Sequence, residues 1–263
     1  MPDSPATLLL VVDIGNTNTV LGLYRGTELL DHFRLESRRG ATSDEMAVLT
    51  EQLLRHRHFE PSDVAAAVIA SVVPQLTPTF TEVCLRVVGK PPLVVGPGTR
   101  TGMPIHIDNP KEVGADRIVN AIAAYEVYRS ACIVVDFGTA TTFDVISGKG
   151  HYQGGVIAPG IGISADALFT RAAKLPRVEI QRPPSVVGKT TVHAIQAGLL
   201  WGYAGLVDGL IARLQAAMGE PARVCATGGL APLIAAETTG IEAVHEFLTL
   251  DGLRLIWERN REA

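Results

Sequence analysis

The stretch LLLVVDIGNTNTVLGL, from Leu8 to Leu23, is the one around which the rest of this chain is organised. An apolar run stops at Asp13, a polar turn follows, and a second apolar run begins, which is typical of a strand, a tight turn and a returning strand. Gly15 lets the backbone of the turn approach a ligand closely, and Asn16 and Thr17 offer amide and hydroxyl donors to an anion. An ordinary hairpin turn can be built from the same residues.

Asp13 places a carboxylate beside a turn that suits phosphate groups. Carboxylate and phosphate repel each other unless a cation lies between them, and Mg²⁺ with a nucleotide is the common case. We therefore expect Asp13 to serve Mg²⁺, either directly or through a water molecule.

A second copy of this pattern lies further along the chain, at VVDFGTATT from Val134 to Thr142. It repeats Val11 to Thr19 with the same Val-Val-Asp, the same glycine and the same final threonine. Two such hairpins indicate two related halves, and facing hairpins could grip one nucleotide from both sides. This repeat makes an ordinary turn the weaker interpretation of either copy.

The length and composition suit a protein with two domains. The 263 residues are enough for two domains of about 100–150 residues each. Hydrophobic residues make up 47% and charged residues 19%, which leaves room for a buried subunit interface. The formal net charge is −4 and no Lys and Arg cluster exceeds short pairs such as Arg38-Arg39, so nucleic acid is not an expected partner.

The chain lacks the patterns of an exported or membrane protein. The apolar run from Leu8 to Val12 is too short for a signal peptide. The most membrane-like segment, Ala194 to Val207, stops at Asp208, short of the roughly 20 residues that a spanning helix needs. We therefore expect a cytoplasmic protein with no membrane partner and with buried thiols. The cysteines, which lack metal or disulfide spacing, are Cys84, Cys132 and Cys225.

The remaining patterns predict alternating strands and helices, which indicates an α/β architecture with partly parallel sheets. Ser43 and Thr191 are expected to cap the first and the longest helix. Further strands are predicted at 29–35, 64–72, 93–95, 154–157 and 223–227, and helices at 44–57, 78–88, 114–128, 163–173, 191–218 and 250–259.

The longest predicted helix carries four glycines that lie near one another. Because glycine costs helix stability, they indicate close approach by another helix, from this chain or from a second subunit. The four are Gly198, Gly202, Gly205 and Gly209.

The segment from Asp108 to Arg117 is the candidate for catalysis. Asn109-Pro110 makes a turn, and Asp116 and Arg117 fall in the first turn of the helix that follows. A carboxylate there can accept a proton from a substrate hydroxyl, while the guanidinium can hold an anionic group. Phosphoryl transfer needs mostly positioning, charge neutralisation and such a base, so these residues suit a kinase. An acidic residue that favours the helix dipole is the plainer alternative.

Taken together, these stretches resemble the type III pantothenate kinases, a branch of the actin-like and sugar-kinase-like ATPase superfamily. The resemblance runs along nearly the whole chain and rests on specific motifs. They are DIGNTN at 13–18, DNPKEVGADR at 108–117, DFGTATT at 136–142, GGVIAPGI at 154–161, GKTTVHAIQAG at 188–198 and TGG at 227–229.

The resemblance implies an α/β fold of two duplicated ribonuclease H-like (actin-like ATPase) domains, 1–118 and 119–263, with a nucleotide cleft between them. The resemblance also allows the last helix to pack on the first domain, although it follows the second domain in the sequence. It further implies a homodimer that phosphorylates pantothenate with ATP, the first step toward coenzyme A.

The resemblance also implies a role for individual residues. Asp116 should be the proton acceptor, and Asp136 should bind a monovalent cation, K⁺ or NH₄⁺, while Mg²⁺ accompanies the nucleotide. ATP should be bound by Asp13, Ile14, Gly15, Asn16, Thr17, Asn18, Thr19, Val20, Thr139, Gly228 and Gly229. Pantothenate should be bound by Gly114, Ala115, Asp116, Arg117 and Thr191.

One position departs from the pattern of the family. Many relatives have a tyrosine just before the acidic Asn-Pro turn, where this chain has Ile107. An isoleucine cannot donate a hydroxyl hydrogen bond, so a substrate contact there would be apolar.

The sequence leaves two other functions open. One is a related sugar or polyol kinase, since the hairpins specify ATP and not the acceptor, and the other is an ATP-binding regulatory factor without catalysis.

Overall fold

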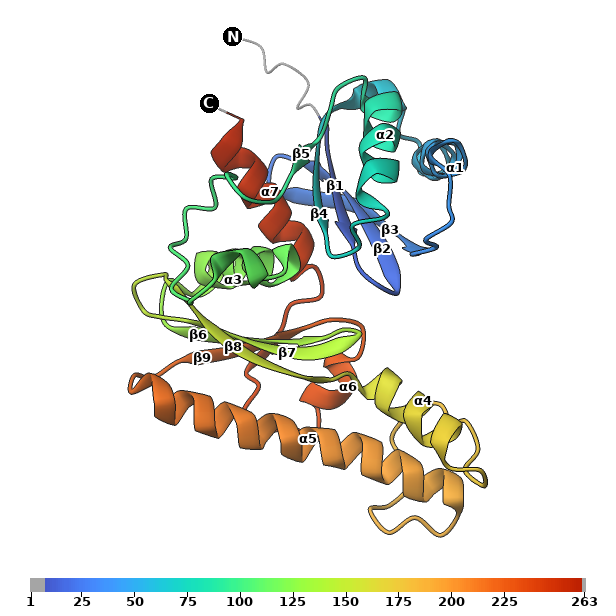
Figure 1. Cartoon of the computed structure of the whole chain (residues 1–263), viewed down its shortest axis with the longest axis vertical. Coiled ribbons are helices and arrows are strands. Elements are labelled where there is room, and N and C mark those ends of the chain that lie inside the picture. The colour runs from blue at the N-terminus through green and yellow to red at the C-terminus, as the bar shows by residue number, and fades with distance from the viewer. Residues whose placement is uncertain (1–7, 262–263) are drawn as a thin grey trace. The chain divides into compact units, whose positions relative to one another are not determined.

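The computed structural model describes residues 8–261, which form two compact units. Unit 1 contains the described residues up to Gly102, the segment Asn109–Ala123 and the described residues from Thr249 onward. Unit 2 contains Met103–Asp108 and Ala124–Leu248. Each unit is built on one five-stranded sheet (Figure 1). The domain boundary between residues 118 and 119 stays a prediction.

Sheet A, in unit 1, has the strand order β3-β2-β1-β4-β5. Strands β1, β2 and β3 form an antiparallel meander, whereas β4 runs parallel to β1 and β5 parallel to β4. β1 is apolar almost throughout because both of its faces are covered. The strands are β1 (Leu8–Ile14), β2 (Asn18–Arg25), β3 (Glu28–Glu36), β4 (Val64–Ser71) and β5 (Leu93–Val94).

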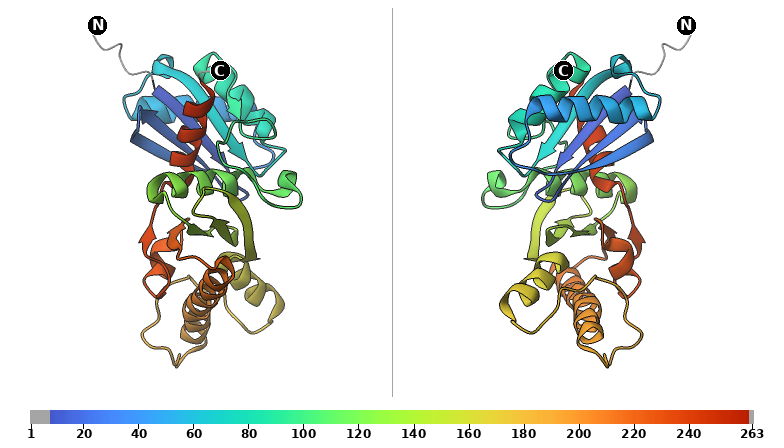
Figure 2. Two further views of the ribbon diagram at one scale, coloured as in Figure 1. Left: turned by 90° about the vertical axis from the view of Figure 1, so that its left-hand side faces the viewer. Right: turned by 90° about the vertical axis from the view of Figure 1, so that its right-hand side faces the viewer.

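Helices cover both faces of sheet A. Helices α1 (Ser43–His56) and α2 (Thr77–Val88) pack on one face, where Met46 and Phe80 join the strand residues in one core (Figure 2). On the other face, the Tyr24 hydroxyl donates to Asp251 at 2.7 Å from α7 (Leu248–Asn260). The face that α7 covers also carries Asp13, because alternate residues of β1 share a face.

Sheet B, in unit 2, repeats this topology with the order β8-β7-β6-β9-β10. Its first three strands are again an antiparallel meander, and the fourth and fifth again run parallel to their neighbours. The two related halves predicted from the repeated hairpin are therefore confirmed. The strands are β6 (Cys132–Phe137), β7 (Ala140–Ile146), β8 (Tyr152–Pro159), β9 (Arg223–Thr227) and β10 (Ala243–Val244).

Helix α5 (Thr191–Met218) is the core helix of unit 2 and packs on sheet B (Figure 1). By length and composition alone it could cross a membrane. The mean hydropathy of its most apolar 18-residue stretch is 1.3, and 39% of that stretch is buried inside the protein. Asp208, where the sequence pattern placed an interruption, lies within the helix. Its carboxylate accepts the backbone N–H groups of Thr239 at 3.0 Å and Gly240 at 2.9 Å, so it caps a neighbouring turn.

The other predicted elements are confirmed with shifts of about two residues at their ends, and α3 (Ala115–Tyr128) begins one residue late. Both predicted caps are one residue off. Thr42 and Thr190 cap α1 and α5, since the N–H groups of Glu45 and His193 bond their hydroxyls at 3.2 and 3.1 Å. Each true cap precedes a second residue able to cap, and its extended backbone decides between the two. The other helices are α4 (Ile161–Arg171), α6 (Ala231–Ala235) and the single turns η1 (Pro61–Asp63) and η2 (Pro110–Glu112).

Thr141 is a buried residue of β7 whose hydroxyl has no hydrogen-bond partner within residues 8–261. A buried hydroxyl left unpaired costs about 1–3 kcal/mol. We expect Thr141→Val, which keeps the shape and removes the hydroxyl, to raise the free energy of unfolding by about 1 kcal/mol. Thermal or urea unfolding measures this change.

Thr50 provides the matched control, because it is equally buried and its hydroxyl donates to the Met46 carbonyl at 2.7 Å. Thr50→Val loses this bond and should give no gain. If both variants change stability alike, the unpaired hydroxyl of Thr141 is not the cause.

Candidate active site

The β1–β2 hairpin of unit 1 has a tight backbone turn at the predicted phosphate site. The Gly15 N–H donates to the Asn18 carbonyl at 3.0 Å, and a Cβ at Gly15 would stand 2.9 Å from that same oxygen. Glycine is therefore required for the turn to close. Asn16 and Thr17 lie exposed at its tip, where their polar groups can meet a ligand.

Ser37 supports this hairpin, a role that the sequence did not reveal. Its N–H donates to the Thr17 carbonyl at 3.0 Å, and its hydroxyl lies 2.9 Å from that of Thr19, which is fully buried. These bonds tie the hairpin to the end of β3. The contact joins residues far apart in the chain, so no local pattern could have indicated it.

Asp116 lies in unit 1 too, in the first turn of α3. The preceding Gly114 packs against Val72, whose Cγ1 would be 3.6 Å from a Cβ at Gly114. Val72 in turn donates its N–H to the Ile14 carbonyl at 3.0 Å. The carboxyl ends of the parallel strands β1 and β4 thus bring the hairpin and the Asp116 loop to one edge of sheet A, where ligands bind in open α/β sheets.

Gly114 is required by the Asp116 side chain itself. A Cβ at Gly114 would stand 2.5 Å from Asp116 Oδ1, the oxygen that accepts the Arg117 N–H at 2.8 Å.

The preceding turn at Asn109 is also as predicted. The side chain of Asn109 accepts the Lys111 N–H at 3.3 Å and donates to Glu112 at 2.7 Å.

The Asp116 carboxyl has an altered proton affinity. Burial raises its pKa above the ordinary value, and the bond from the Arg117 N–H and the Arg117 charge lower it by a smaller amount. Desolvation disfavours the charged form, so the carboxylate is a stronger base than an exposed aspartate. A half-buried carboxylate of this kind suits proton abstraction from a hydroxyl.

The hairpin of unit 2 joins β6 to β7 and contains Asp136 and Thr139. Its turn closes when the Gly138 N–H donates to the Ala140 carbonyl at 3.1 Å. Gly160, at the start of α4, packs directly on this turn: a Cβ there would collide with the Thr139 carbonyl and stand 2.7 Å from that of Gly138. Gly160 belongs to a motif quoted above, but its role depends on a contact that the sequence does not show.

The loop that contains Gly228 also packs against the β6–β7 hairpin. The φ of Gly228 is +95°, and a Cβ there would stand 2.7 Å from both Asp136 Oδ1 and the Phe137 carbonyl oxygen. The Gly228 loop therefore packs so closely against the Asp136 carboxylate and the Phe137 carbonyl that only a glycine fits at this position. Gly229 follows on the exposed side of the loop.

The part of α5 that contacts the loop beside the unit 2 hairpin is at Tyr203, further along the helix than Thr191. Thr191 is exposed at the start of α5, about 18 Å along the helix from Tyr203 at roughly 1.5 Å per residue. The Tyr203 hydroxyl donates to the Pro159 carbonyl at 2.9 Å, next to Gly160. Thr191 therefore lies about three helical turns along α5 from the residue that contacts this loop.

Ile107, at the position that departs from the family, lies half-buried in unit 2. A Cβ at Gly154 of β8 would stand 3.4 Å from the Ile107 Cγ2.

Within residues 8–261, no three His, Cys, Asp or Glu side chains gather in the manner of a dedicated metal centre. Each unit contains one hairpin with an aspartate near the end of its first strand, Asp13 in unit 1 and Asp136 in unit 2. That Asp13 and Asp136 approach the same triphosphate stays a prediction.

Comparison with known proteins identifies the family. The family described as type III pantothenate kinase matches residues 9–213. The type III pantothenate kinase of Myxococcus xanthus is 56% identical over 96% of this chain and 99% of its own length. The chain belongs to the type III pantothenate kinase family.

Solved structures show that this member of the type III pantothenate kinase family has the fold of actin-like ATPases and sugar kinases. The ethanolamine utilization protein EutJ of Carboxydothermus hydrogenoformans matches with a TM-score of 0.57 and 16% identity, over 97% of this chain and 91% of that one. The ROK hexokinase of Thermus thermophilus matches with a TM-score of 0.51 and 13% identity, over 97% and 100%. The predicted fold class is confirmed.

Proposed function

We propose that this chain transfers the γ-phosphoryl group of ATP to the primary hydroxyl of pantothenate, giving 4'-phosphopantothenate and ADP. Identity of 56% over nearly the full chain to a type III pantothenate kinase carries the assignment. The half-buried carboxylate of Asp116, at the same sheet edge as the β1–β2 hairpin, supports it.

In the proposed reaction, Asp116 accepts the hydroxyl proton of pantothenate as the alcohol oxygen attacks the γ-phosphorus. The new P–O bond forms while the bond to the β-phosphate oxygen breaks, and ADP leaves. Gly114, Ala115 and Arg117 hold the substrate, with Arg117 supplying positive charge for an anionic group. Thr191 is proposed as a further substrate contact. Such a reaction depends chiefly on positioning and on charge neutralisation.

The residues proposed to bind ATP come from both units. Asp13 to Val20 surround the phosphates and Thr139 contacts them, while Gly228 and Gly229 flank the adenosine. Asp13 fits Mg²⁺, because a single half-buried carboxylate beside phosphates is a common arrangement for this ion. When bound, Mg²⁺ would neutralise charge on the phosphates.

One assay tests the function directly. Purified protein is incubated with ATP, Mg²⁺ and K⁺, with and without pantothenate, and ADP and the phosphorylated product are followed by coupled assay and mass analysis. We expect ADP release that depends on pantothenate and a product heavier by one phosphoryl group. Turnover only with a sugar or polyol, or ATP binding without any turnover, would contradict the proposal.

Asp136 is proposed to hold K⁺ or NH₄⁺, because its carboxylate and the Phe137 carbonyl both lie beside Gly228. We expect Asp136→Ala to abolish the activation of kcat/KM for ATP by K⁺, measured as initial rates across K⁺ concentrations. Asp136→Asn, which keeps an oxygen ligand without its charge, should retain a weaker response. Activation by K⁺ that is unchanged in the alanine variant would show that the cation binds elsewhere.

A homodimer is proposed from the exposed face of α5. Cβ atoms built at Gly198, Gly202 and Gly205 meet nothing within 4 Å, so packing among residues 8–261 does not explain these glycines. Large apolar side chains are also exposed in the same unit, on α4, on the loop before α5 and on the first turn of α5. They are Ile163, Leu168, Phe169, Val186, Val187 and Val192. A second copy of the chain is the proposed partner of this face.

We expect Gly202→Leu to convert the dimer into a monomer, because a large side chain would hold the two helices apart. Size-exclusion chromatography with light scattering measures the mass. Gly40→Leu is the control, since Gly40 in unit 1 also faces open space. A dimer that survives Gly202→Leu would place the interface on another surface.

We also propose that the protein acts in the cytoplasm, without nucleic acid or membrane as a partner. The support is a formal net charge of −4 and an α5 helix that packs on sheet B and uses Asp208 for a structural contact.

A further inference from the structure

Helix α3 connects the candidate base with a polar cluster at its other end. Asp116 lies in its first turn and Tyr128 is its last residue. The two are about 18 Å apart along the helix axis, at roughly 1.5 Å per residue. A continuous helix is stiff over such a length, so a change in how its last turn is held moves the first turn as well.

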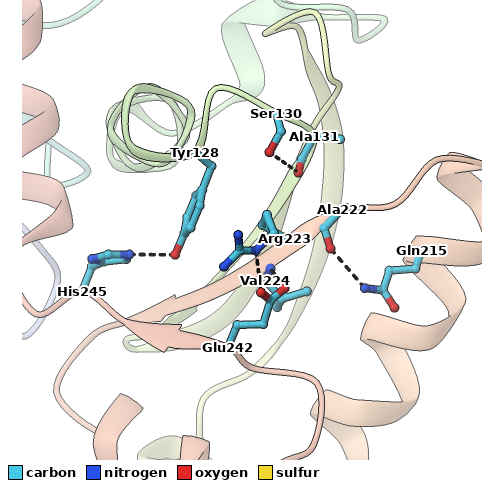
Figure 3. A network of polar contacts seen from close by, with 9 residues as sticks. All are labelled: Tyr128, Ser130, Ala131, Gln215, Ala222, Arg223, Val224, Glu242 and His245. Carbon is cyan, nitrogen blue, oxygen red and sulfur yellow. Dashed lines mark hydrogen bonds and ion pairs between the residues drawn. The ribbon is translucent and has the colours of Figure 1, made fainter.

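Tyr128 is held by two side chains of unit 2 (Figure 3). Its hydroxyl lies 2.8 Å from His245 Nε2, and the two rings meet edge to face with centroids 5.8 Å apart. The Arg223 guanidinium lies over the tyrosine ring, 5.2 Å from its centroid. Burial raises the pKa of Tyr128 to about 12, so its hydroxyl keeps its proton near neutral pH.

The partners of Tyr128 are themselves fixed to sheet B. Arg223 bonds the Glu242 carboxylate at 2.5 Å, and that carboxylate also accepts the Val224 N–H at 3.0 Å (Figure 3). The His245 N–H donates to the Ala226 carbonyl of β9 at 2.8 Å. The last turn of α3 is therefore anchored to the sheet whose β6–β7 hairpin contains Asp136 and Thr139.

We propose that Tyr128 is a positioning residue for Asp116, acting through its hydrogen bond with His245. The inference rests on the proposed role of Asp116 as proton acceptor. A tilt of only about 5° at the last turn displaces the first turn by about 1.5 Å over this length. Misplacement of a reacting group by about 1 Å can cost as much as 10²-fold in rate.

The test begins with Tyr128→Phe, which keeps the ring beneath Arg223 and removes the hydroxyl. We expect kcat to fall about tenfold, within the range that misplacement produces, while KM for ATP changes less than twofold. His245→Ala should reproduce this loss, and His245→Gln should restore part of kcat because its amide can replace Nε2. The double variant Tyr128→Phe/His245→Ala should be no slower than either single variant.

Gln215→Met supplies the control. The side chain of Gln215 on α5 donates to the Ala222 carbonyl at 3.3 Å, so this bond links α5 to the loop before β9 and not to α3 (Figure 3). The kcat of the Gln215→Met variant should match that of the parent protein. Melting temperatures are recorded for every variant.

Two results would overturn the role of Tyr128: a parental kcat in Tyr128→Phe, or an equal loss of kcat in Gln215→Met at the same fall in melting temperature. A different result marks failure of the proposed function. In that case the parent protein itself releases no ADP in response to pantothenate, and the role of Tyr128 falls with it.

Discussion

Asp116→Asn should lower the pantothenate-dependent kcat by about 10³-fold, within the 10²–10⁴-fold that general bases contribute. The amide keeps the size of the side chain and its bond from the Arg117 N–H, but it cannot accept the substrate proton. The hairpin that is proposed to bind ATP is unchanged by this substitution. Steady-state kinetics measure the loss, and calorimetric titration with a non-hydrolysable ATP analogue should give nearly the parental affinity.

Asp108→Asn provides the control for Asp116, because Asp108 is an exposed carboxylate in the same sequence motif. It should keep most of the parental kcat. If Asp116→Asn also keeps most of its kcat, the residue is not the proton acceptor.

Gly228→Ala is expected to lower kcat/KM for ATP by about 10²-fold, as a displacement of about 1 Å in a binding loop can do. The added Cβ would stand 2.7 Å from Asp136 Oδ1 and from the Phe137 carbonyl, and φ is +95°. The loop must therefore move away from the β6–β7 hairpin. Initial rates at varied ATP and K⁺ concentrations measure the effect.

Gly219→Ala separates this clash from simple backbone strain. Gly219 ends α5 with φ at +66°, and a Cβ there meets nothing within 4 Å. The strain should cost about 1–2 kcal/mol of stability and leave kcat/KM unchanged. Equal kinetic losses in both variants would mean that strain alone, and not contact with Asp136, accounts for the effect at Gly228.

The repeated hairpin was the part of the fold that the sequence predicted best. Asp13 and Asp136 end apolar strands in near-identical local sequences, so local patterns suffice to indicate the duplication. The short elements β10 and α6 could not be predicted, because a two-residue strand forms only when its parallel neighbour β9 is present. The predicted caps Ser43 and Thr191 were wrong for another reason: each follows a second polar residue, Thr42 or Thr190, and the backbone decides which of the two caps the helix.

The candidate site was predicted only as separate segments. Asp116 and Gly114 were found from their motif, but the packing of Gly114 on Val72 joins residues far apart in the chain. The same holds for Ser37 beneath the first hairpin and for Gly160 against the second. Tyr128 ends a predicted helix without any motif, and its partner His245 directly follows β10, a strand that no pattern indicated.

The burial of all three cysteines has a practical consequence. Desolvation raises the pKa of the Cys84 and Cys225 thiols to about 12 and also raises that of Cys132. Thiols of this kind are inert to maleimide dyes near neutral pH. A cysteine introduced on the surface of each unit would therefore be the preferred labelling site in the native background. Energy transfer between two such dyes could then follow the separation of the units as nucleotide is added.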